Sequence, residues 1–349
     1  MNIDNCGEFA LIERLKKCVT APTDFVIIGI SDDASAFETE AGGITLMTAD
    51  ALVEGVHFNL SFVPFRDLGW RAMAANLSDI AAMGGWPTWA TVCLCTPSSC
   101  SVEALEALYG GMDAVAAPLG CRIVGGDTTA SPSGLMISIS LLGQVMRERM
   151  TPRSGVKSGD LFCVTGHLGG SRAGLEVLWR GHLGRPLPGC FEEAIEKYLK
   201  PVPRVREAAA MGDAAAIHAA IDISDGLSSE VHHLCRMSRV GARIEGGAVP
   251  IHADTEAVAR RCDAKGLAFA LSGGEDFELL FAVAPRDAEG VARAVEAATG
   301  TPVTIIGEAV PPAEGVRIRG QDGGWDGLPE AGYEHFKDQR SAVSKKADG

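Results

Sequence analysis

The chain is poor in basic residues, and this shortage limits the partners that it can bind. Lysine and arginine number 31 against 45 aspartates and glutamates, which gives a formal net charge of −14 over 349 residues. Nucleic acids and anionic membrane surfaces are held by clustered basic side chains, so neither is an expected partner. An anionic ligand of this chain needs help from cations.

Long apolar runs are also absent. No segment has the roughly 20 consecutive apolar residues of a membrane helix. The N-terminus, from Met1 to Cys6, has no positive region followed by an apolar stretch of the kind found in secretory signals. We therefore expect the protein to work in the cytoplasm.

Two further absences exclude common kinds of site. The ten cysteines form no Cys-x-x-Cys pair with nearby histidines, and Cys93, Cys95, Cys121 and Cys163 lie in apolar runs. This distribution favours buried free thiols over a zinc site. The chain contains no Gly-x-x-x-x-Gly-Lys-Ser/Thr sequence and no protein-kinase motif set, which excludes those two kinds of nucleotide site.

What the chain does contain is a series of apolar segments that end in polar or glycine-rich residues. A prior of roughly 100–200 residues per domain suggests two domains. Strands that alternate with helices in both halves are typical of an α/β (α+β) protein. The expected strands are 25–30, 44–47, 121–124, 161–164 and 217–221.

Two helices are predicted clearly. The first runs from about Phe65 to Met83, with apolar residues at helical spacing, and it places Asn76 and Asp79 on one face. The second begins at 225–228, directly after an Asp-x-Ser-Asp-Gly turn. Unpaired backbone N–H groups at that helix start are suited to holding a phosphate.

A polar segment at 147–155, which contains a proline, separates two apolar strands and is the expected domain boundary. We predict an N-terminal domain over 1–148 and a C-terminal α/β domain over 149–336. Apolar residues become rare from Lys337 onward, so 337–349 is expected to be a flexible tail.

Six aspartates are expected at or just beyond the ends of strands and helices. Two like charges 4 Å apart repel by roughly 4 kcal/mol at an effective dielectric near 20, so a cluster of carboxylates requires cations. All-oxygen ligands suit Mg²⁺, which commonly bridges carboxylates and phosphates. Taken singly, each aspartate is better explained as a helix cap or turn residue. The six are Asp33, Asp50, Asp79, Asp127, Asp222 and Asp225, with hydroxyls from Thr48 and Ser224 nearby.

Three other features are open to a functional interpretation. The segment 164–174 imitates a dinucleotide fingerprint, but its glycine spacing is wrong, which favours a tight packing turn over a phosphate cradle. Arg153 could neutralise a triphosphate, although a single arginine in a linker is more often only solvated. His57 could contact a phosphate, although a lone histidine is usually structural.

Short motifs recur in order along nearly the whole chain. They lie at 7–9, 32–34, 48–50, 55–58, 76–84, 125–129, 153–155, 222–227, 272–278 and 332–336. The Gly-Gly-Asp and Asp-x-Ser-Asp-Gly turns are similar to those of aminoimidazole ribonucleotide synthetase, selenophosphate synthetase and a hydrogenase maturation factor. The start Gly7-Glu8-Phe9, the sequence Val-x-Gly-Val-His-Phe and Ser-Gly-Gly-Glu-Asp-Phe-Glu complete a set that resembles the motifs of thiamine-monophosphate kinases.

The resemblance implies a fold and a reaction. The fold has two α/β domains of the aminoimidazole ribonucleotide synthetase type, of which the N-terminal one binds ATP and Mg²⁺ and forms a homodimer through its sheet. In the reaction, ATP is the co-substrate and gives its γ-phosphoryl group to the phosphate of thiamine monophosphate. The transfer is direct and in line, gives thiamine diphosphate and ADP, and passes through no phosphoenzyme.

By position, the resemblance also implies the roles of single residues. The catalytic residues would be Asp33, Asp127, Asp222 and Asp225. Several Mg²⁺ ions would be held by Asp33, Thr48, Ala49, Asp50, Asp79, Asp127, Asp222 and Asp225. ATP would contact Tyr109, Gly126, Asp127, Arg153 and Ser224. Thiamine monophosphate would contact His57, Glu275 and Tyr333.

Two departures from the family pattern and several alternatives stay open. Ser31 stands where the family usually has glycine, and Ala49 stands where it usually has a hydroxyl residue, which leaves only its backbone as a ligand. Without the resemblance, Glu275 is a loop acid and Tyr333 a packing aromatic. The alternative functions are another ATP-dependent synthetase of the same superfamily, a non-catalytic sensor of nucleotide or thiamine phosphate and, as the weakest, a nicotinamide dehydrogenase.

Overall fold

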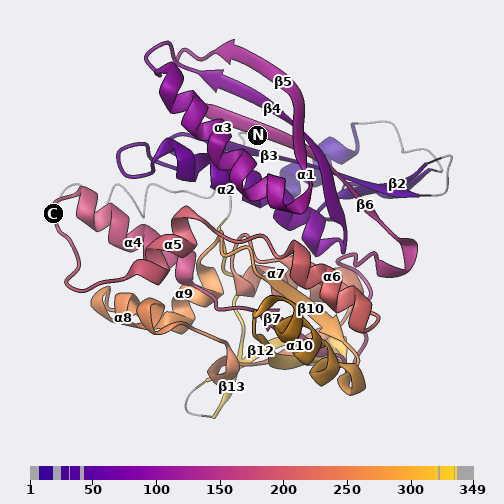
Figure 1. The fold of residues 1–349 in the computed structure, drawn as a ribbon. Helices are drawn as coiled ribbons and strands as arrows, with labels where there is room; N and C mark the ends of the chain where they lie inside the picture. Colours follow the sequence, from indigo (N-terminus) through magenta and orange to yellow (C-terminus); the bar gives the residue numbers. More distant parts are fainter. Residues whose placement is uncertain are drawn as a thin grey trace.

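The computed structural model describes residues 8–18, 25–30, 32–39, 43–320, 323–333 and 335. Residues 1–7, the departure at Ser31 and the predicted tail over 337–349 lie outside the described residues. The described chain forms two α/β units, each built on one sheet, which lie one above the other in Figure 1. Among these residues, no helix combines the length and the apolar character needed to span a membrane.

The N-terminal unit holds a six-stranded sheet in the order β1-β2-β3-β6-β4-β5. Neighbouring strands are antiparallel except β4 and β5, which are parallel and are connected through α3. Helices α2 and α3 pack together against this sheet (Figure 1). The elements are α1 (Glu8–Lys16), β1 (Val26–Ile28), β2 (Ser35–Glu38), β3 (Ile44–Val53), α2 (Phe65–Ala82), β4 (Trp86–Thr96), α3 (Val102–Ala116), β5 (Arg122–Ala130) and β6 (Met136–Val145).

The C-terminal unit holds a seven-stranded sheet in the order β13-β12-β9-β11-β7-β10-β8. Only β12 and β9 are parallel neighbours. The elements are β7 (Leu161–Thr165), α4 (Gly170–His182), α5 (Glu192–Leu199), α6 (Val205–Ala214), β8 (Ala219–Asp222), α7 (Leu227–Ser238), β9 (Gly241–Glu245), α8 (Ala253–Arg261), α9 (Gly266–Ser272), β10 (Leu279–Val283), α10 (Pro285–Thr299), β11 (Val303–Val310), β12 (Val316–Arg319) and β13 (Trp325–Gly327).

Most of the predicted elements are present. Helix α2 ends one residue before Met83, the predicted end, and α7 begins at Leu227, inside the predicted range. Strand β8 ends at Asp222, directly before the acidic turn. The predicted domain boundary after residue 148 falls in the connection between β6 and β7.

Two predicted turns are instead parts of strands. Asp50 and Asp127 are predicted to lie beyond strand ends, but β3 and β5 continue past them. β3 pairs with β6 over its whole length, and β5 pairs with β4 to its last residue. The hydrogen bonds of these ladders therefore outweigh the poor strand preference of aspartate and glycine. Asp79 also lies inside an element, because α2 continues to Ala82.

Helix α2 is buried between the two units. Its buried residues include Leu68, Leu77 and Ile80, and they belong to a core that also contains Val205 of α6 and Phe281 of β10. One hydrophobic core therefore passes from the N-terminal unit into the C-terminal unit. A second core lies on the opposite face of the C-terminal sheet, beneath α7 and α9.

Glycines allow α2 and α3 to pack closely. A Cβ atom at Gly111 of α3 would lie 1.8 Å from the backbone oxygen of Arg66, and one at Gly69 of α2 would lie 1.9 Å from that of Leu108. Neither position has room for a side chain. The two helix backbones touch at these points, which fixes α2 relative to α3.

The other face of the N-terminal sheet carries exposed apolar side chains. Met47 of β3 is 48% exposed, Trp89 of β4 is 52% exposed and Val124 of β5 is 61% exposed. Met47 and Trp89 both pair with Leu142 of β6, from its two sides. These four residues line one shallow hollow on the sheet, and we call them the open-face patch.

The cysteines follow the prediction of buried free thiols only in part. Cys121 and Cys163 are buried and free, as expected. Cys93 is exposed and Cys95 is half-buried, so the prediction is wrong for these two. Strand β4 alternates between its two faces, and Cys93 falls on the same exposed face as Trp89.

Candidate active site

Three aspartates from distant parts of the chain meet where the two units join. Asp33 lies between β1 and β2, Asp79 lies in α2 and Asp222 ends β8. One carboxylate oxygen of each lies within 4.8 Å of the other two. Asp33 and Asp222 are buried, and Asp79 is half-buried. The fold therefore brings these three of the six candidate acids into one group, which we call the aspartate triad.

Strand β3 joins the aspartate triad from the side of the N-terminal sheet. The Thr48 hydroxyl donates a hydrogen bond to the Asp79 carboxylate. The backbone N–H of Asp50 donates to Asn76 Oδ1 at 3.2 Å. Asn76 and Asp79 thus share the helix face predicted from their spacing, and that face meets β3.

The other two members of the triad have partners from elsewhere. Ser78 Oγ donates to Asp222 Oδ2 at 2.7 Å. Arg153 Nη2 donates to Asp33 Oδ1 at 2.6 Å, and the Arg153 backbone N–H lies 3.1 Å from Asp32 Oδ2. The second oxygen, Asp33 Oδ2, is buried and has no hydrogen-bond partner among the described residues. It is therefore a candidate ligand atom of this acidic group.

Burial and mutual repulsion raise the pKa values of these acids. The pKa of Asp222 is raised well above 3.8 by burial and then by Asp33, and that of Asp79 by burial and then by Asp50. Burial followed by repulsion from Asp33 also raises the pKa of Asp50, and raises that of Asp32 to about 7. The group therefore takes up protons unless another cation neutralises it.

The turn between β8 and α7 ties two further segments to the site. The backbone N–H of Glu275 donates to Ser224 O at 2.7 Å, and that of Tyr333 donates to Asp225 O at 3.2 Å. The Asp225 N–H donates to Glu230 Oε1 at 2.9 Å. The backbone of the predicted ATP and metal turn therefore positions two predicted substrate residues.

His57 lies beside the C-terminal segment that carries Tyr333. His57 Nδ1 accepts a hydrogen bond from the Val53 N–H at 3.0 Å, so the neutral ring carries its proton on Nε2. His57 Nε2 lies 3.4 Å from His335 Nε2, and His335 Nδ1 lies 3.4 Å from the Tyr333 hydroxyl oxygen. Burial lowers the pKa of His57, so the ring is neutral at pH 7.

Arg71 of α2 has no role predicted from the sequence, yet it lies among the predicted substrate residues. It is 1% exposed, and its Nη2 donates to Glu275 Oε2 at 2.7 Å and to His57 O at 3.3 Å. Its Cζ lies 4.1 Å from the centre of the Tyr198 ring. Arg71 precedes Ser78 by seven residues, so both lie on the helix face that meets the C-terminal unit.

Four other residues contact the site without having been predicted as site residues. Asp32 precedes Asp33, Ser78 precedes Asp79, and His335 follows Tyr333 by two positions. These neighbours could have been found by extending each motif by one or two residues. The fourth, Glu230, lies one turn into α7 and carries no signal of its own in the sequence.

The remaining predicted residues lie on strands β3 and β5 and on helix α3. Asp127 and Gly126 are on β5, an edge strand separated from β3 by β6 and β4. Asp127 is exposed and pairs with Cys93. Tyr109 is on α3, and burial raises its pKa. Ala49 is exposed on β3. Their roles stay predictions.

The glycine-rich segment 164–174 is held by a carboxylate of the chain itself. Gly169 N–H donates to Asp276 Oδ2 at 2.5 Å, and Ser171 N–H donates to Asp276 Oδ1 at 3.0 Å. Asp276 is completely buried, so this helix start holds a protein carboxylate instead of an external phosphate. The structure therefore confirms the packing interpretation.

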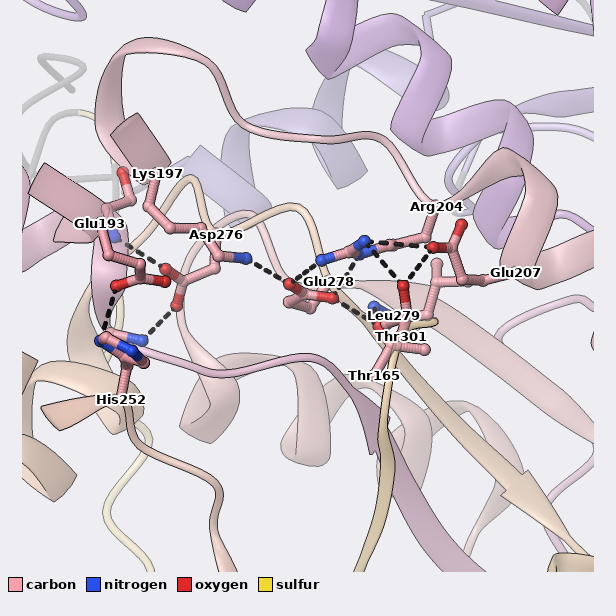
Figure 2. Close-up of polar contacts among 12 residues, drawn as sticks. Thr165, Glu193, Lys197, Arg204, Glu207, His252, Asp276, Glu278, Leu279 and Thr301 are labelled. Carbon is pink, nitrogen blue, oxygen red and sulfur yellow. Dashed lines mark hydrogen bonds and ion pairs between the residues drawn. The ribbon is translucent and has the colours of Figure 1, made fainter. Parts of the chain in front are cut away.

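Glu278 forms a second buried anchor two residues further on. It is bound by the side chains of Lys197, Arg204 and Thr165, as Figure 2 shows. Burial alone would raise the pKa of Glu278, but Lys197 and Arg204 lower it to about 2. The last part of the predicted Ser-Gly-Gly-Glu-Asp-Phe-Glu motif is thus structural.

Comparison with known proteins agrees with this architecture. The family model described as AIR synthase related protein, N-terminal domain, matches residues 31–145. The model of the C-terminal domain of the same proteins matches residues 157–319. The two α/β units and the acidic group at their junction thus define a protein of the AIR synthase related class.

The relatives identify the branch within this class. A thiamine-monophosphate kinase of Salmonella typhimurium is 36% identical over 337 residues, which cover 95% of this chain and 98% of the relative. The solved structure of AaThiL complexed with AMPPCP and TMP matches with a TM-score of 0.82 and 31% identity, over 96% of this chain and 99% of that chain. The thiamine-monophosphate kinase from Stenotrophomonas maltophilia K279a matches with a TM-score of 0.73 and 33% identity, over 92% and 98%. The chain belongs to the thiamine-monophosphate kinase family.

Proposed function

We propose that this chain catalyses the ATP-dependent phosphorylation of thiamine monophosphate to thiamine diphosphate. The observation that carries the proposal is the aspartate triad, in which acids from both units bring carboxylate oxygens within 4.8 Å of one another. Relatives that cover nearly the whole chain are named for this activity, and AaThiL is complexed with AMPPCP, an ATP analogue, and TMP. The γ-phosphoryl group passes directly from ATP to the substrate phosphate.

The donor atoms of the aspartate triad fit Mg²⁺. They are all oxygens, Asp33 Oδ2 accepts no hydrogen bond from the described residues, and the raised pKa values favour an added cation. When bound, Mg²⁺ neutralises the phosphates of ATP and the charge of the group in transfer. The residues proposed to hold the ions are Asp33, Thr48, Asp50, Asp79 and Asp222, and Asp225, Asp127 and the Ala49 backbone complete the predicted set.

Arg153 places a positive charge next to the metal-binding residues. Its Nη2 is bound to Asp33, whereas its Nε is buried and finds no hydrogen-bond partner among the residues described. A guanidinium with a free donor can contact a phosphate oxygen of ATP while it keeps its carboxylate partner. Ser224, on the turn that follows β8, supplies a hydroxyl to the same nucleotide.

The reaction requires little acid–base catalysis by the protein. The acceptor phosphate is already an oxyanion at neutral pH, so positioning and charge neutralisation carry the transfer. His57, neutral with its proton on Nε2, donates a hydrogen bond to the acceptor. The Glu275 carboxylate receives the cationic thiazolium, and the Tyr333 ring packs against a heterocycle of the substrate.

The open-face patch supports a homodimer formed through the N-terminal sheet. Exposed apolar side chains that gather on one sheet face commonly mark a protein interface. A two-fold axis would bring the same patch of a second copy against it. The cytoplasmic location expected from the sequence stays a prediction.

The direct test is to incubate the full chain with ATP, MgCl₂ and thiamine monophosphate. We expect thiamine diphosphate and ADP in equal amounts, with no product when EDTA replaces the metal. Absence of thiamine diphosphate over a range of metal ions and pH would overturn the proposal. ATP consumption with aminoimidazole precursors would then indicate a synthetase, and thermal stabilisation by ligands without turnover would indicate a sensor.

A further inference from the structure

The loop that carries Glu275 is anchored firmly in the C-terminal unit. Glu275 and Phe277 have φ angles of +65° and +49°, a region that non-glycine residues rarely adopt. The neighbours Asp276 and Glu278 are completely buried, and their carboxylates are bound on all sides (Figure 2). The surrounding contacts therefore impose a strained backbone at the position of the proposed substrate residue.

The side chain of Glu275 is held from the opposite unit. Arg71 Nη2 donates to Glu275 Oε2 at 2.7 Å and to the His57 backbone oxygen at 3.3 Å. One nitrogen atom of α2 therefore links the two residues that receive the acceptor substrate. Because Arg71 takes Oε2, the oxygen that remains for a cationic ligand is Glu275 Oε1.

The surroundings of Arg71 are poorly suited to stability alone. Its Nε and Nη1 are buried and have no hydrogen-bond partner within the part of the chain that the structure describes, and the guanidinium stacks on Tyr198. Unpaired buried donors lower stability, and a buried ion pair can often be replaced by apolar side chains without loss. A fully buried arginine with two unpaired donors is therefore better explained by what it does to Glu275 and His57.

We infer that Arg71 is a positioning residue that sets the selectivity of this site for a cationic phosphate acceptor. It fixes the free oxygen of Glu275 relative to His57, so that the thiazolium charge and the phosphate of one molecule are contacted together. The inference rests on the proposed function, because it takes Glu275 and His57 as the acceptor contacts.

The test compares three variants of the full chain. Arg71→Met removes the charge and keeps most of the length, and Arg71→Lys keeps the charge and loses the planar fork. Trp70→Phe is the matched control, because Trp70 is the preceding residue of α2 and donates to Pro201 O at 2.7 Å, another contact between the units. Dissociation constants are measured by calorimetry for thiamine monophosphate and for an analogue whose thiazolium is replaced by an uncharged thiophene ring.

The expected result is a loss of charge selectivity. In Arg71→Met, the preference for the charged over the uncharged acceptor falls by about tenfold, the effect of one charged hydrogen bond. Arg71→Lys retains part of the preference, and Trp70→Phe retains all of it. The KM for ATP changes less than about twofold in every variant, since ATP contacts the other side of the site.

A merely structural role gives a different outcome. Equal weakening of charged and uncharged acceptors, or a parallel rise of both KM values, would overturn the inference. If Arg71→Met does not fold, the Arg71→Lys result decides, because an unchanged preference there together with an unchanged melting temperature also counts against it. The proposed function is judged separately, from thiamine diphosphate formation by the unmodified chain.

Discussion

At the level of single residues, the aspartate triad opposes folding until a cation joins it. Carboxylate oxygens of three aspartates lie within 4.8 Å of one another. Arg153 donates a hydrogen bond to Asp33, whereas Asp79 and Asp222 accept hydrogen bonds from the hydroxyl groups of Thr48 and Ser78. The raised pKa values of the last two acids have the same origin.

Removing one of these charges is expected to raise the stability of the metal-free protein and to lower its activity. Asp222→Asn relieves repulsion, so the melting temperature in EDTA rises, while turnover falls at least about a hundredfold because a metal ligand is lost. Thermal unfolding with and without Mg²⁺, together with product formation, measures both effects.

Two controls sharpen this test. Asp213→Asn removes a charge of α6 outside the triad. Its partner there is Arg149, in an exposed ion pair of little energetic value, so the melting temperature should change only slightly and turnover should not change. Asp127→Asn examines the exposed acid on β5, and we expect lost turnover without a gain in stability, because no triad carboxylate crowds it. Unchanged turnover in both Asp222→Asn and Asp127→Asn would show that these acids are not metal ligands.

The stability of the metal-free chain is expected to fall as the pH rises from 6.5 to 8.5. The folded pKa values of Asp79 and Asp222 lie well above 3.8, and that of Asp32 is about 7, so the folded state binds more protons than the unfolded state. Stability then decreases with pH. Below pH 6.5, buried histidines such as His233, with a pKa lowered to about 4, act in the opposite direction.

Saturating Mg²⁺ is expected to remove this slope, because the ion replaces the protons. Melting temperatures at several pH values, in EDTA and in MgCl₂, check the expectation. A slope that is identical in both buffers would contradict it, since the protons would then belong to groups away from the metal site.

Single residues were predictable where a motif is local. The Asp222–Asp225 turn follows a buried strand and precedes a helix, and this order is visible in the sequence. The contact between Asp33, Asp79 and Asp222 depends on how the two sheets are placed around α2. The spacing of these residues in the sequence does not determine that placement. Arg71 was missed because nothing in the sequence distinguishes an arginine that is buried in the fold from one that is exposed.

At the level of elements, the contact between α2 and α3 is the most sensitive to substitution. Gly111→Ala would place a methyl group 1.8 Å from the backbone oxygen of Arg66. The helices must separate, and we expect a loss of about 1–3 kcal/mol or more in the free energy of unfolding, measured by urea denaturation.

The adjacent glycine offers a matched control. At Gly110, the nearest atom to an added Cβ is the side-chain atom Arg66 Nη1 at 3.4 Å, which can move. Gly110→Ala should therefore raise stability by about 0.5–1 kcal/mol through better helix propensity. Equal effects of the two substitutions would show that helix propensity, and not the close approach, governs this contact.

The type of each predicted element, helix or strand, was predicted correctly, but the ends of some strands were not. Helical spacing gave α2 to within one residue, because its apolar pattern is local. The ends of β3 and β5 were placed too early, since Asp50, Gly126 and Asp127 are residues that usually end strands. Pairing with β6 and β4 extends both strands, and such partners are known only once the sheet order is known.

At the level of the whole molecule, the open-face patch is expected to be an interface between two copies. Sedimentation of the full chain should give a dimer, and Met47→Lys combined with Trp89→Lys should give a monomer, because two charges cannot be buried against apolar partners. Trp325→Lys, on β13 in the C-terminal unit, is the control and should leave the dimer intact. A wild-type monomer at micromolar concentration would refute the interface.

The core that runs through α2 has a further consequence for unfolding. Since the hydrophobic core of one unit continues into the other, we expect that neither unit stays folded when the other unfolds. On heating, far-ultraviolet circular dichroism and ligand binding should disappear together, in a single transition. No partly unfolded intermediate that still binds one of the two substrates should accumulate during the transition.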